Sequence, residues 1–346
     1  MKVLIYEHVT DAARLGESSV EYPESVRIEG AAMRSAVVAD FQAVPGVETL
    51  EPAGRGFEEC VAAAEAVLLI APESDGVLAA LTRRVERIQT PLLSPSSEFC
   101  AWAGDKSAAA ERPASWGVPV PRGRRLTAED RSSGDLAWPV VLKPNDGCGS
   151  QGVLRIATRA ALDGVVRRLR LGPASAPTSL GSYRLEEFVP GEAVSVALLN
   201  GPGGIFALPA CRQKLSDDGS FAYLGGSAPL PAPHAGRAQA LALKAAAAMP
   251  IWRGYIGLDL VLGPVDDGSA DYLIEVNPRL TTSYVGLRRL AQSNLAQAMI
   301  DVAAGRMPSL EFHRGSVEFT PAGAVTYCDD APATMCAARP AEAFAT

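Results

Sequence analysis

The chain has 346 residues, enough for about two domains, and 48% of them are hydrophobic and 21% charged, as in globular proteins with a sizeable core. The net charge of −7 argues against broad binding to nucleic acid or anionic membranes, because no excess of Lys and Arg exists to neutralise phosphates. The start, MKVLIYEH, has too few apolar residues for a signal peptide, and no apolar run is long enough to span a bilayer. We therefore expect a cytoplasmic protein. A homodimer stays open.

The first 95 residues alternate strand and helix patterns. Lys2–Tyr6 (KVLIY) and Val67–Ala71 (VLLIA) are short apolar runs typical of buried strands, and Ser25–Phe41 between them has a helical pattern. Ser74–Val85 has the spacing of an amphipathic helix, which its first residue, a serine, would cap. This alternation predicts an α/β domain over residues 1–95, with a parallel sheet covered by helices.

Beyond a helical stretch, Ser96–Trp116, and a turn-rich region, the pattern changes to paired strands joined by glycine-containing turns. We expect three hairpins, Val140–Lys143 with Val153–Ala157, Arg184–Phe188 with Ala193–Leu199, and Tyr255–Leu262 with Asp271–Asn277. Hairpins separated by helices predict an α+β domain over residues 96–330. The last segment, 331–346, is rich in Ala and Pro without periodicity, and we expect it to be poorly ordered.

The stretch VVLKPNDGCGSQGV contains a G-x-G-x-x-G pattern at residues 147–152. A dinucleotide-binding unit would need a helix directly after the glycines, but VLRIAT follows, and helical pattern returns only near Ala160. A strand–loop–strand hairpin fits better, because glycines let backbone N–H groups approach phosphate oxygens, and Lys143 adds a positive charge. A surface hairpin without a ligand is the alternative.

A candidate metal site lies in the third expected hairpin. Glu275 and Asn277 stand at i and i+2 of YLIEVNP, so both side chains point to one face of the strand. Folding the hairpin about its turn near Asp267 brings Asp259 opposite Glu275. Hard oxygen ligands of this kind suit Mg²⁺ or Mn²⁺. The alternative is an exposed face of an edge strand, but Arg279 follows at once and has access to the same cluster.

These motifs occur together in a known order. Lys106 in GDK, Lys143 before the glycine loop, EEFVPGE at 186–192, Asp259, and EVNPR at 275–279 follow one another as in ATP-grasp ligases. The chain resembles that superfamily from about Ser94 to Ala304, and the α/β segment before it resembles the pre-ATP-grasp domain. The resemblance implies an ATP-grasp fold, α/β plus α+β, with an N-terminal Rossmann-like domain and two subdomains that clamp ATP in the cleft between them.

The resemblance also implies roles for individual residues. Lys106 and Lys143 would contact the phosphates of ATP, Asp259, Glu275 and Asn277 would hold Mg²⁺, and Lys143 and Arg279 would be catalytic. The glycine loop would cover the phosphates and the EEFV hinge would read adenine. The expected nucleotide-binding set is Lys106, Lys143, Gly147, Gly149, Ser150, Gln151, Gly152, Glu186, Glu187, Phe188, Val189 and Glu192.

One departure from the family pattern concerns the ribose. Many members read G-x-E after the hinge, and that Glu binds the ribose hydroxyls. Here Gly191 is followed directly by Glu192, and Ala193 occupies the expected acidic position. Either Glu192 takes the role through a one-residue shift or the ribose is held in another way.

The implied reaction joins a small-molecule carboxylate to an amine. The γ-phosphoryl group of ATP would activate the carboxylate as an acyl phosphate, and the amine would attack it, releasing ADP and phosphate. EVNPRLTTSYVG and the Ile-Tyr-Glu start resemble the branch that joins tyramine to the γ-carboxyl of glutamate in methanofuran-type coenzyme biosynthesis. We expect substrate contacts from Arg212, Lys214, Tyr223, Thr281, Thr282, Ser283 and Tyr284, unless these are ordinary connecting loops.

Three alternatives remain open. The first is a ligase of the same fold with other substrates, such as a dipeptide or polyglutamate-adding enzyme. The second is a nucleotide-binding regulatory protein without turnover, against which the complete set of Asp259, Glu275 and Asn277 speaks. The third is an oxidoreductase of Rossmann type, which the residues after Gly152 disfavour.

Overall fold

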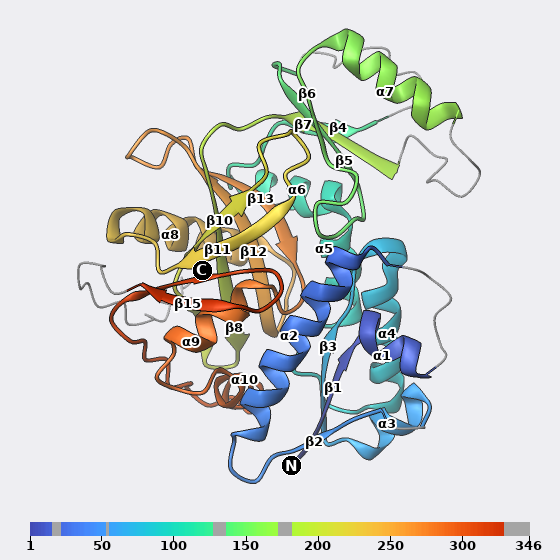
Figure 1. Cartoon of the computed structure of the whole chain (residues 1–346), viewed down its shortest axis with the longest axis vertical. Coiled ribbons are helices and arrows are strands. Elements are labelled where there is room, and N and C mark those ends of the chain that lie inside the picture. Colours follow the sequence, from blue (N-terminus) through green and yellow to red (C-terminus); the bar gives the residue numbers. More distant parts are fainter. Residues whose placement is uncertain (16–21, 53–54, 127–135, 172–181, 329–346) are drawn as a thin grey trace.

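The computed structural model describes residues 1–15, 22–52, 55–126, 136–171 and 182–328, so the tail predicted at 331–346 lies outside the described residues. Within these ranges the strands form three sheets, of three, eight and four strands. Figure 1 shows the three-stranded sheet beside the N-terminus and the four-stranded sheet, with helix α7, at the opposite end of the molecule. No helix in the described ranges is long and apolar enough to cross a membrane.

The first domain has the parallel sheet that the strand–helix alternation predicts. Its strands, in spatial order, are β2 (Glu48–Leu50), β1 (Lys2–Glu7) and β3 (Ala66–Ile70), and both pairings are parallel. Alternate residues of a strand point to opposite faces. Val3 and Ile5 accordingly belong to the core that contains α2, and Leu4 and Tyr6 to the core that contains α3 and α4. The helices are α1 (His8–Leu15), α2 (Glu24–Gln42), α3 (Phe57–Ala63) and α4 (Val77–Ile88).

The predicted serine cap of the fourth helix is wrong. Ser74 lies in a 3₁₀ turn, η1 (Ser74–Gly76), and α4 begins only at Val77 without a side-chain cap. Gly76 has φ of +67°, in the left-handed region that glycine tolerates and that breaks a right-handed helix. The 3₁₀ turn is therefore separate from α4 and belongs to the connection between β3 and α4.

The eight-stranded sheet is antiparallel and contains the predicted metal-binding hairpin. Its order is β13-β12-β8-β10-β11-β14-β15, with β9 paired to β8 outside this path. The pairing of β12 with β13 is confirmed, and it brings Asp259 opposite Glu275 as the sequence predicts. The strands are β8 (Glu192–Gly201), β9 (Gly204–Ala207), β10 (Cys211–Leu215), β11 (Tyr223–Ala228), β12 (Gly254–Leu262), β13 (Tyr272–Asn277), β14 (Ser316–Phe319) and β15 (Val325–Cys328).

The four-stranded sheet contains the glycine loop. Its order is β4-β7-β5-β6, with all pairings antiparallel, and the strands are β4 (Gly123–Arg125), β5 (Val140–Pro144), β6 (Leu154–Ile156) and β7 (Tyr183–Glu187). The predicted hairpin of β5 with β6 is confirmed. The predicted hairpin of β7 with β8 is wrong, because β7 pairs with β4 and β5 whereas β8 pairs with β9, β10 and β12 in the other sheet.

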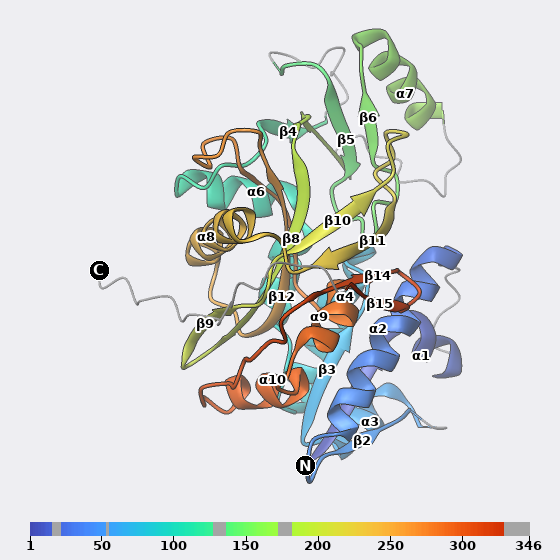
Figure 2. The same ribbon diagram turned by 60° about the vertical axis from the view of Figure 1, so that its left-hand side comes forward.

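The segment between β7 and β8 therefore passes from one sheet to the other (Figure 2). Its last residue, Gly191, lies so close to β12 that a Cβ would meet the carbonyl oxygen of Leu262 at 2.3 Å. Only glycine allows this approach of two backbones. A four-residue linker that contains Pro190 and Gly191 resembles a hairpin turn in the sequence, which explains the wrong pairing.

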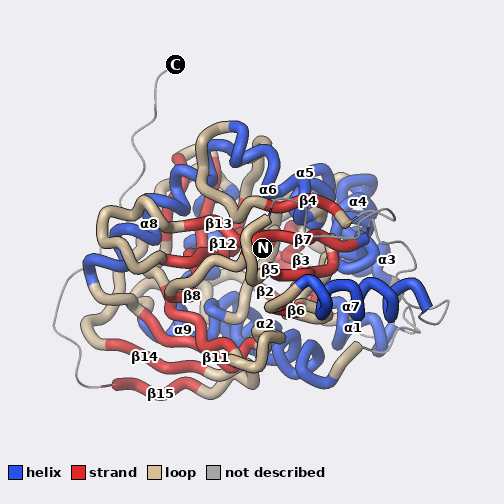
Figure 3. Tube along the Cα trace, turned by 90° about the horizontal axis from the view of Figure 1, so that it is seen from above, coloured by secondary structure: helices blue, strands red, loops and turns tan. Residues whose placement is uncertain are grey.

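The remaining helices flank the larger sheets, as the view from above shows (Figure 3). They are α5 (Ser97–Gly104), α6 (Lys106–Ser115), α7 (Arg159–Leu171), α8 (Ala232–Ala248), α9 (Ser283–Leu290) and α10 (Leu295–Ala303). The single helical stretch predicted at 96–116 is broken at Asp105, whose side chain caps α6 by accepting from the backbone N–H groups of Ser107 and Ala108. This cap sets Lys106 at the first position of α6.

One hydrophobic core joins the first domain to the eight-stranded sheet. Val37 and Phe41 of α2 are fully buried in the same cluster as Leu287 of α9 and Met299 of α10. A polar contact reinforces it, because the hydroxyl of Tyr284 donates to Asp40 at 2.6 Å. Helix α2 is therefore fixed against both domains.

Candidate functional site

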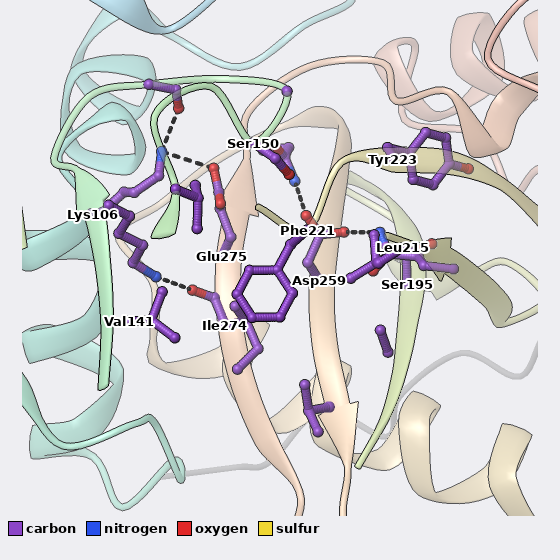
Figure 4. A pocket seen from close by; sticks show the side chains of 18 of the residues that line it. Lys106, Val141, Ser150, Ser195, Leu215, Phe221, Tyr223, Asp259, Ile274 and Glu275 are labelled. Atoms are coloured by element: carbon purple, nitrogen blue, oxygen red, sulfur yellow. Dashed lines mark hydrogen bonds and ion pairs between the residues drawn. The ribbon is translucent and has the colours of Figure 1, made fainter. Parts of the chain in front are cut away.

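A cavity of about 470 Å³ lies between the four-stranded sheet, the eight-stranded sheet and α2. Figure 4 shows Lys106 and Tyr223 on opposite sides of it, with Asp259 and Glu275 on neighbouring strands between them. Its lining includes most of the residues predicted from the sequence, namely Lys106, Lys143, Gly147, Gly149, Ser150, Gln151, Glu186, Glu187, Phe188, Val189, Tyr223, Asp259, Glu275, Asn277, Arg279, Thr281, Thr282 and Ser283.

Two buried lysines stand on the wall of the cavity. The ammonium group of Lys106 lies 2.9 Å from Glu275 Oε1 and donates to the carbonyl oxygen of Gly147. Lys143 Nζ lies 2.6 Å from Glu186 Oε1 and donates to the carbonyl oxygen of Ile274 at 3.3 Å. Burial would lower the pKa of Lys106, but the nearby acids Glu275 and Glu73 contribute in the opposite direction, and the net effect is a raised pKa. Lys106 is therefore a cation at neutral pH.

Asp259 and Glu275 form a half-buried acidic pair. Burial and the charge of Glu275 raise the pKa of Asp259 to about 6, although Asn277 Nδ2 at 3.0 Å and Gln213 Nε2 at 2.8 Å donate hydrogen bonds to it. Burial would also raise the pKa of Glu275, but Lys106 and Lys143 hold it below its ordinary value. Two carboxylates and the amide oxygen of Asn277 are hard donors of the kind that Mg²⁺ prefers, so the residues fit that ion.

The glycine loop between β5 and β6 lines the same cavity as this cluster. Gly149 and Gly152 have φ of +59° and +72°, which glycine adopts without strain. The loop is tied to the first domain, because Asp146 Oδ2 accepts from the backbone N–H of Asp75 at 3.1 Å. The helix that a dinucleotide site needs directly after the glycines is replaced by β6, and α7 begins only at Arg159. A strand after the glycines does not fit a dinucleotide-binding unit, and the role of the loop toward phosphates stays a prediction.

The linker after β7 forms a second wall, with aromatic character. Phe188 stacks on Phe221 with ring centroids 6.1 Å apart, and the guanidinium of Arg155 lies 4.2 Å from the Phe188 ring centroid. Stacked rings suit a planar base. Neither Phe221 nor Arg155 was expected from the sequence, because they lie outside the family motifs.

Five predicted residues do not line the cavity: Gly152, Glu192, Arg212, Lys214 and Tyr284. Glu192 instead pairs with Arg212 and lies 2.7 Å from His234 Nδ1, while Ala193 faces the cavity. Glu192 therefore lies outside the cavity lining, and a role for it toward the ribose stays a prediction. Lys214 Nζ lies 3.2 Å from Glu318 Oε1 at the surface, and Tyr284 is buried against Asp40.

Two acids of the first domain reach the cavity region without having been predicted. Glu29 of α2 lines the cavity, and the buried Glu73 holds Arg279, with 2.9 Å between Arg279 Nε and Glu73 Oε1. Glu73 follows the carboxyl end of β3, an edge at which ligand sites of parallel sheets form, and this signal could have identified it. Glu29 lies within a helix and carries no such signal.

Family comparison agrees with the motifs and the fold. The model of the ATP-grasp domain matches residues 103–283, slightly more than half of the chain, and that of the pre ATP-grasp 3 domain matches residues 37–98. The chain therefore belongs to the ATP-grasp ligase family. The resemblance seen in the motifs and the predicted fold are both confirmed.

Individual proteins are more distant. The chain is 27% identical over 256 residues to tyramine–L-glutamate ligase of Methanocaldococcus fervens, covering 73% of this chain and 70% of that protein. An ATP-grasp superfamily protein from Archaeoglobus fulgidus has the same fold with a TM-score of 0.68, 21% identity and 92% of each chain covered. A biotin carboxylase domain from Hydrogenobacter thermophilus, whose structure contains MgADP, has a TM-score of 0.63 and 19% identity, covering 92% of this chain and 73% of that domain.

Proposed function

We propose that this protein is an ATP- and Mg²⁺-dependent ligase that joins a carboxylate to an amine and releases ADP and phosphate. The observation that supports this most is the convergence on one cavity of Lys106, Lys143 and the cluster of Asp259, Glu275 and Asn277. Catalysis of phosphoryl transfer depends mainly on positive charge placed around the phosphates. The two lysines supply such charge, and the acidic cluster would hold the Mg²⁺ ion that supplies more. Mn²⁺ fits the same donors.

The nucleotide would lie across the two walls. Phe188 and Val189 are suited to hold adenine, and the backbone N–H groups of residues 147–152 are suited to the phosphates. Lys106 and Lys143 would add positive charge beside the phosphate chain. Asp259, Glu275 and Asn277 would hold Mg²⁺, which when bound neutralises charge that develops on the phosphate oxygens.

The substrate carboxylate would attack the γ-phosphorus of ATP, which breaks the bond to ADP and forms an acyl phosphate. The amine nitrogen then attacks the acyl carbon, the bond to phosphate breaks, and the amine loses a proton to solvent. Arg279 is suited to stabilise charge on the transferred phosphoryl group, and Glu73 orients its guanidinium. Positioning of the reactants accounts for much of such catalysis.

For the substrates, we propose the γ-carboxyl of glutamate and tyramine or a similar amine. The similarity to tyramine–L-glutamate ligase supports this pair, and Tyr223, Thr281, Thr282 and Ser283 offer a ring and hydroxyls on the cavity wall. Arg212, Lys214 and Tyr284 are left out of this set, because they do not line the cavity.

The test is ADP release measured over paired acids and amines, with glutamate plus tyramine as the first pair. ADP that appears only when both substrates are present supports the ligase. AMP in place of ADP would exclude the acyl-phosphate route, and ADP with another pair would keep the reaction and change the substrates. Binding of MgATP without turnover of any pair would favour a regulatory protein.

Two substitutions test the residues themselves. Lys143→Ala and Glu275→Ala should each reduce turnover at least about 100-fold. The first removes a positive charge beside the phosphates, and the second removes a ligand of the Mg²⁺ that would neutralise them. Lys244→Ala, which removes an exposed lysine on α8, is the matched control and should keep full activity. Circular dichroism of each variant checks that the fold is kept. Wild-type turnover in either variant would remove that residue from the proposed machinery.

A further inference from the structure

Glu29 is an acid inside the cavity that the proposed phosphoryl chemistry does not use. It projects from α2 of the first domain, and its carboxylate accepts a hydrogen bond from Thr282 Oγ1 at 3.2 Å. Within the described residues no cation lies within ion-pair distance of it, since Arg279 is paired with Glu73 and the two lysines with Glu275 and Glu186. Glu29 therefore presents a carboxyl group to the cavity.

Such a group is unfavourable beside a polyphosphate unless it binds something else. Burial raises the pKa of Glu29, and Arg279 and Thr282 offset this only in part, so its ionised form is only partly compensated. The hydroxyls of Thr281 and Ser283, 2.9 Å apart, line the same wall. A single carboxylate beside hydroxyls provides too few hard ligands for a divalent ion, but it matches the three donors of a primary ammonium group.

We propose that Glu29 binds the primary ammonium group of a substrate, on the wall formed by α2 and residues 281–283. The inference rests on the proposed ligase function and names the chemical class that this part of the site selects. Two sources carry that group, the α-ammonium of an amino-acid substrate and the ammonium of the amine substrate. The hydroxyl of Thr282 orients the carboxylate for either of them.

The experiment compares the full-length wild type with Glu29→Gln, which keeps the shape and removes the charge. Calorimetric titration of glutamate and of tyramine into the MgADP-loaded protein gives each dissociation constant. Loss of one charged hydrogen bond should weaken one of the two ligands about 10- to 100-fold. The affinity for MgADP should stay unchanged. Glu29→Asp, which keeps the charge, should recover part of the loss.

Two arms distinguish the sources. If the amino acid carries the group, wild type should bind glutamate more tightly than glutarate, which lacks the ammonium, and Glu29→Gln should lose that preference. If the amine carries it, only tyramine binding should weaken. The control is Glu24→Gln, an exposed acid near the start of the same helix, which should bind both ligands as wild type does.

The proposal is overturned if Glu29→Gln binds both ligands as tightly as wild type, or if wild type binds neither. These outcomes are separate from failure of the ligase function. A wild type that releases no ADP with any pair counts against the reaction, while the binding comparison still decides whether Glu29 holds an ammonium group.

Discussion

One buried carboxylate beside the cavity, that of Glu186, pairs with two buried cations. Glu186 is 4% exposed and accepts from Lys143 at 2.6 Å and from Arg184 Nε at 2.7 Å. Arg184 is itself 2% exposed, so this carboxylate compensates two buried cations. Removing one partner of a buried pair leaves an uncompensated charge, which costs more than the pair contributes. The effect of a substitution here depends on which partner remains.

Glu186→Gln should lower the free energy of unfolding by about 3 kcal/mol or more, because it leaves two buried cations without their carboxylate. Lys143→Ala should cost less, since Arg184 still compensates Glu186. Urea unfolding of the two variants measures the difference. Equal losses of unfolding free energy in the two variants would contradict the pairing of Glu186 with both cations.

Tyr284 has a structural contact in place of the substrate contact expected from its motif. Its hydroxyl donates to Asp40 at 2.6 Å, and Arg288 Nε donates to the same carboxylate at 2.9 Å, so α9 is tied to α2. The sequence places Tyr284 beside Thr282 and Ser283, but a helix beginning at Ser283 turns the tyrosine away from the cavity. Adjacent residues of a motif can therefore serve different purposes.

Tyr284→Phe should lower the free energy of unfolding by about 1–3 kcal/mol, because the buried Asp40 loses one donor. Its KM values for MgATP and both substrates should match wild type. Chemical denaturation and steady-state ADP release measure the two quantities. A raised KM for the amine with unchanged stability would restore the substrate role.

At the scale of elements, each strand that local patterns predicted is present, but seven others in the described ranges, among them β10, β11 and β14, were not predicted. The pairs β5–β6 and β12–β13 were predictable, because each pair is joined by a turn and alternation sets its faces. The partners of β7 and β8 were not, since alternation shows that a strand exists but not which sheet it enters. The break at Asp105 and the left-handed Gly76 depend on capping and backbone details that periodicity does not reveal.

Gly191→Ala tests the linker between the two sheets. A Cβ there would lie 2.3 Å from the carbonyl oxygen of Leu262, so the linker and the end of β12 must move apart, and we expect the wall containing Phe188 to be disturbed. We expect a loss of about 1–3 kcal/mol of stability and weaker nucleotide binding. Gly236→Ala, in α8 with no atom within 4 Å of the added Cβ, is the control and should be neutral or stabilising. Thermal unfolding and MgADP titration follow both effects.

Across the whole molecule, the cavity is built by both domains. The motifs of residues 106–279 predicted the charged and glycine-rich parts of its lining from the sequence, because each motif combines residue types that bind phosphate or metal. The contributions of Glu29 and Glu73 were not predicted, since contacts between domains leave no local pattern. The glycine loop is likewise held across domains, by Asp146 and the backbone of Asp75.

Asp146→Ala should loosen the glycine loop, because it removes the acceptor that ties the loop to η1. Amide hydrogen exchange of residues 145–152 should become faster, and the KM for MgATP should rise. Asp163→Ala, on α7, is the control and should change neither. Unchanged exchange in Asp146→Ala would show that the contact does not restrain the loop.

The ion pair of Glu73 with Arg279 has a consequence for how such a protein can be altered. The arginine suited to the transferred phosphoryl group is oriented by a carboxylate from the first domain, and the proposed ammonium-binding Glu29 comes from that domain too. A chimera that exchanges residues 1–95 with those of a relative would thus replace both Glu73, which orients Arg279, and Glu29, which is proposed to bind the ammonium group. On the roles proposed for Glu29 and Arg279, such a chimera would change substrate choice and the alignment of Arg279 together.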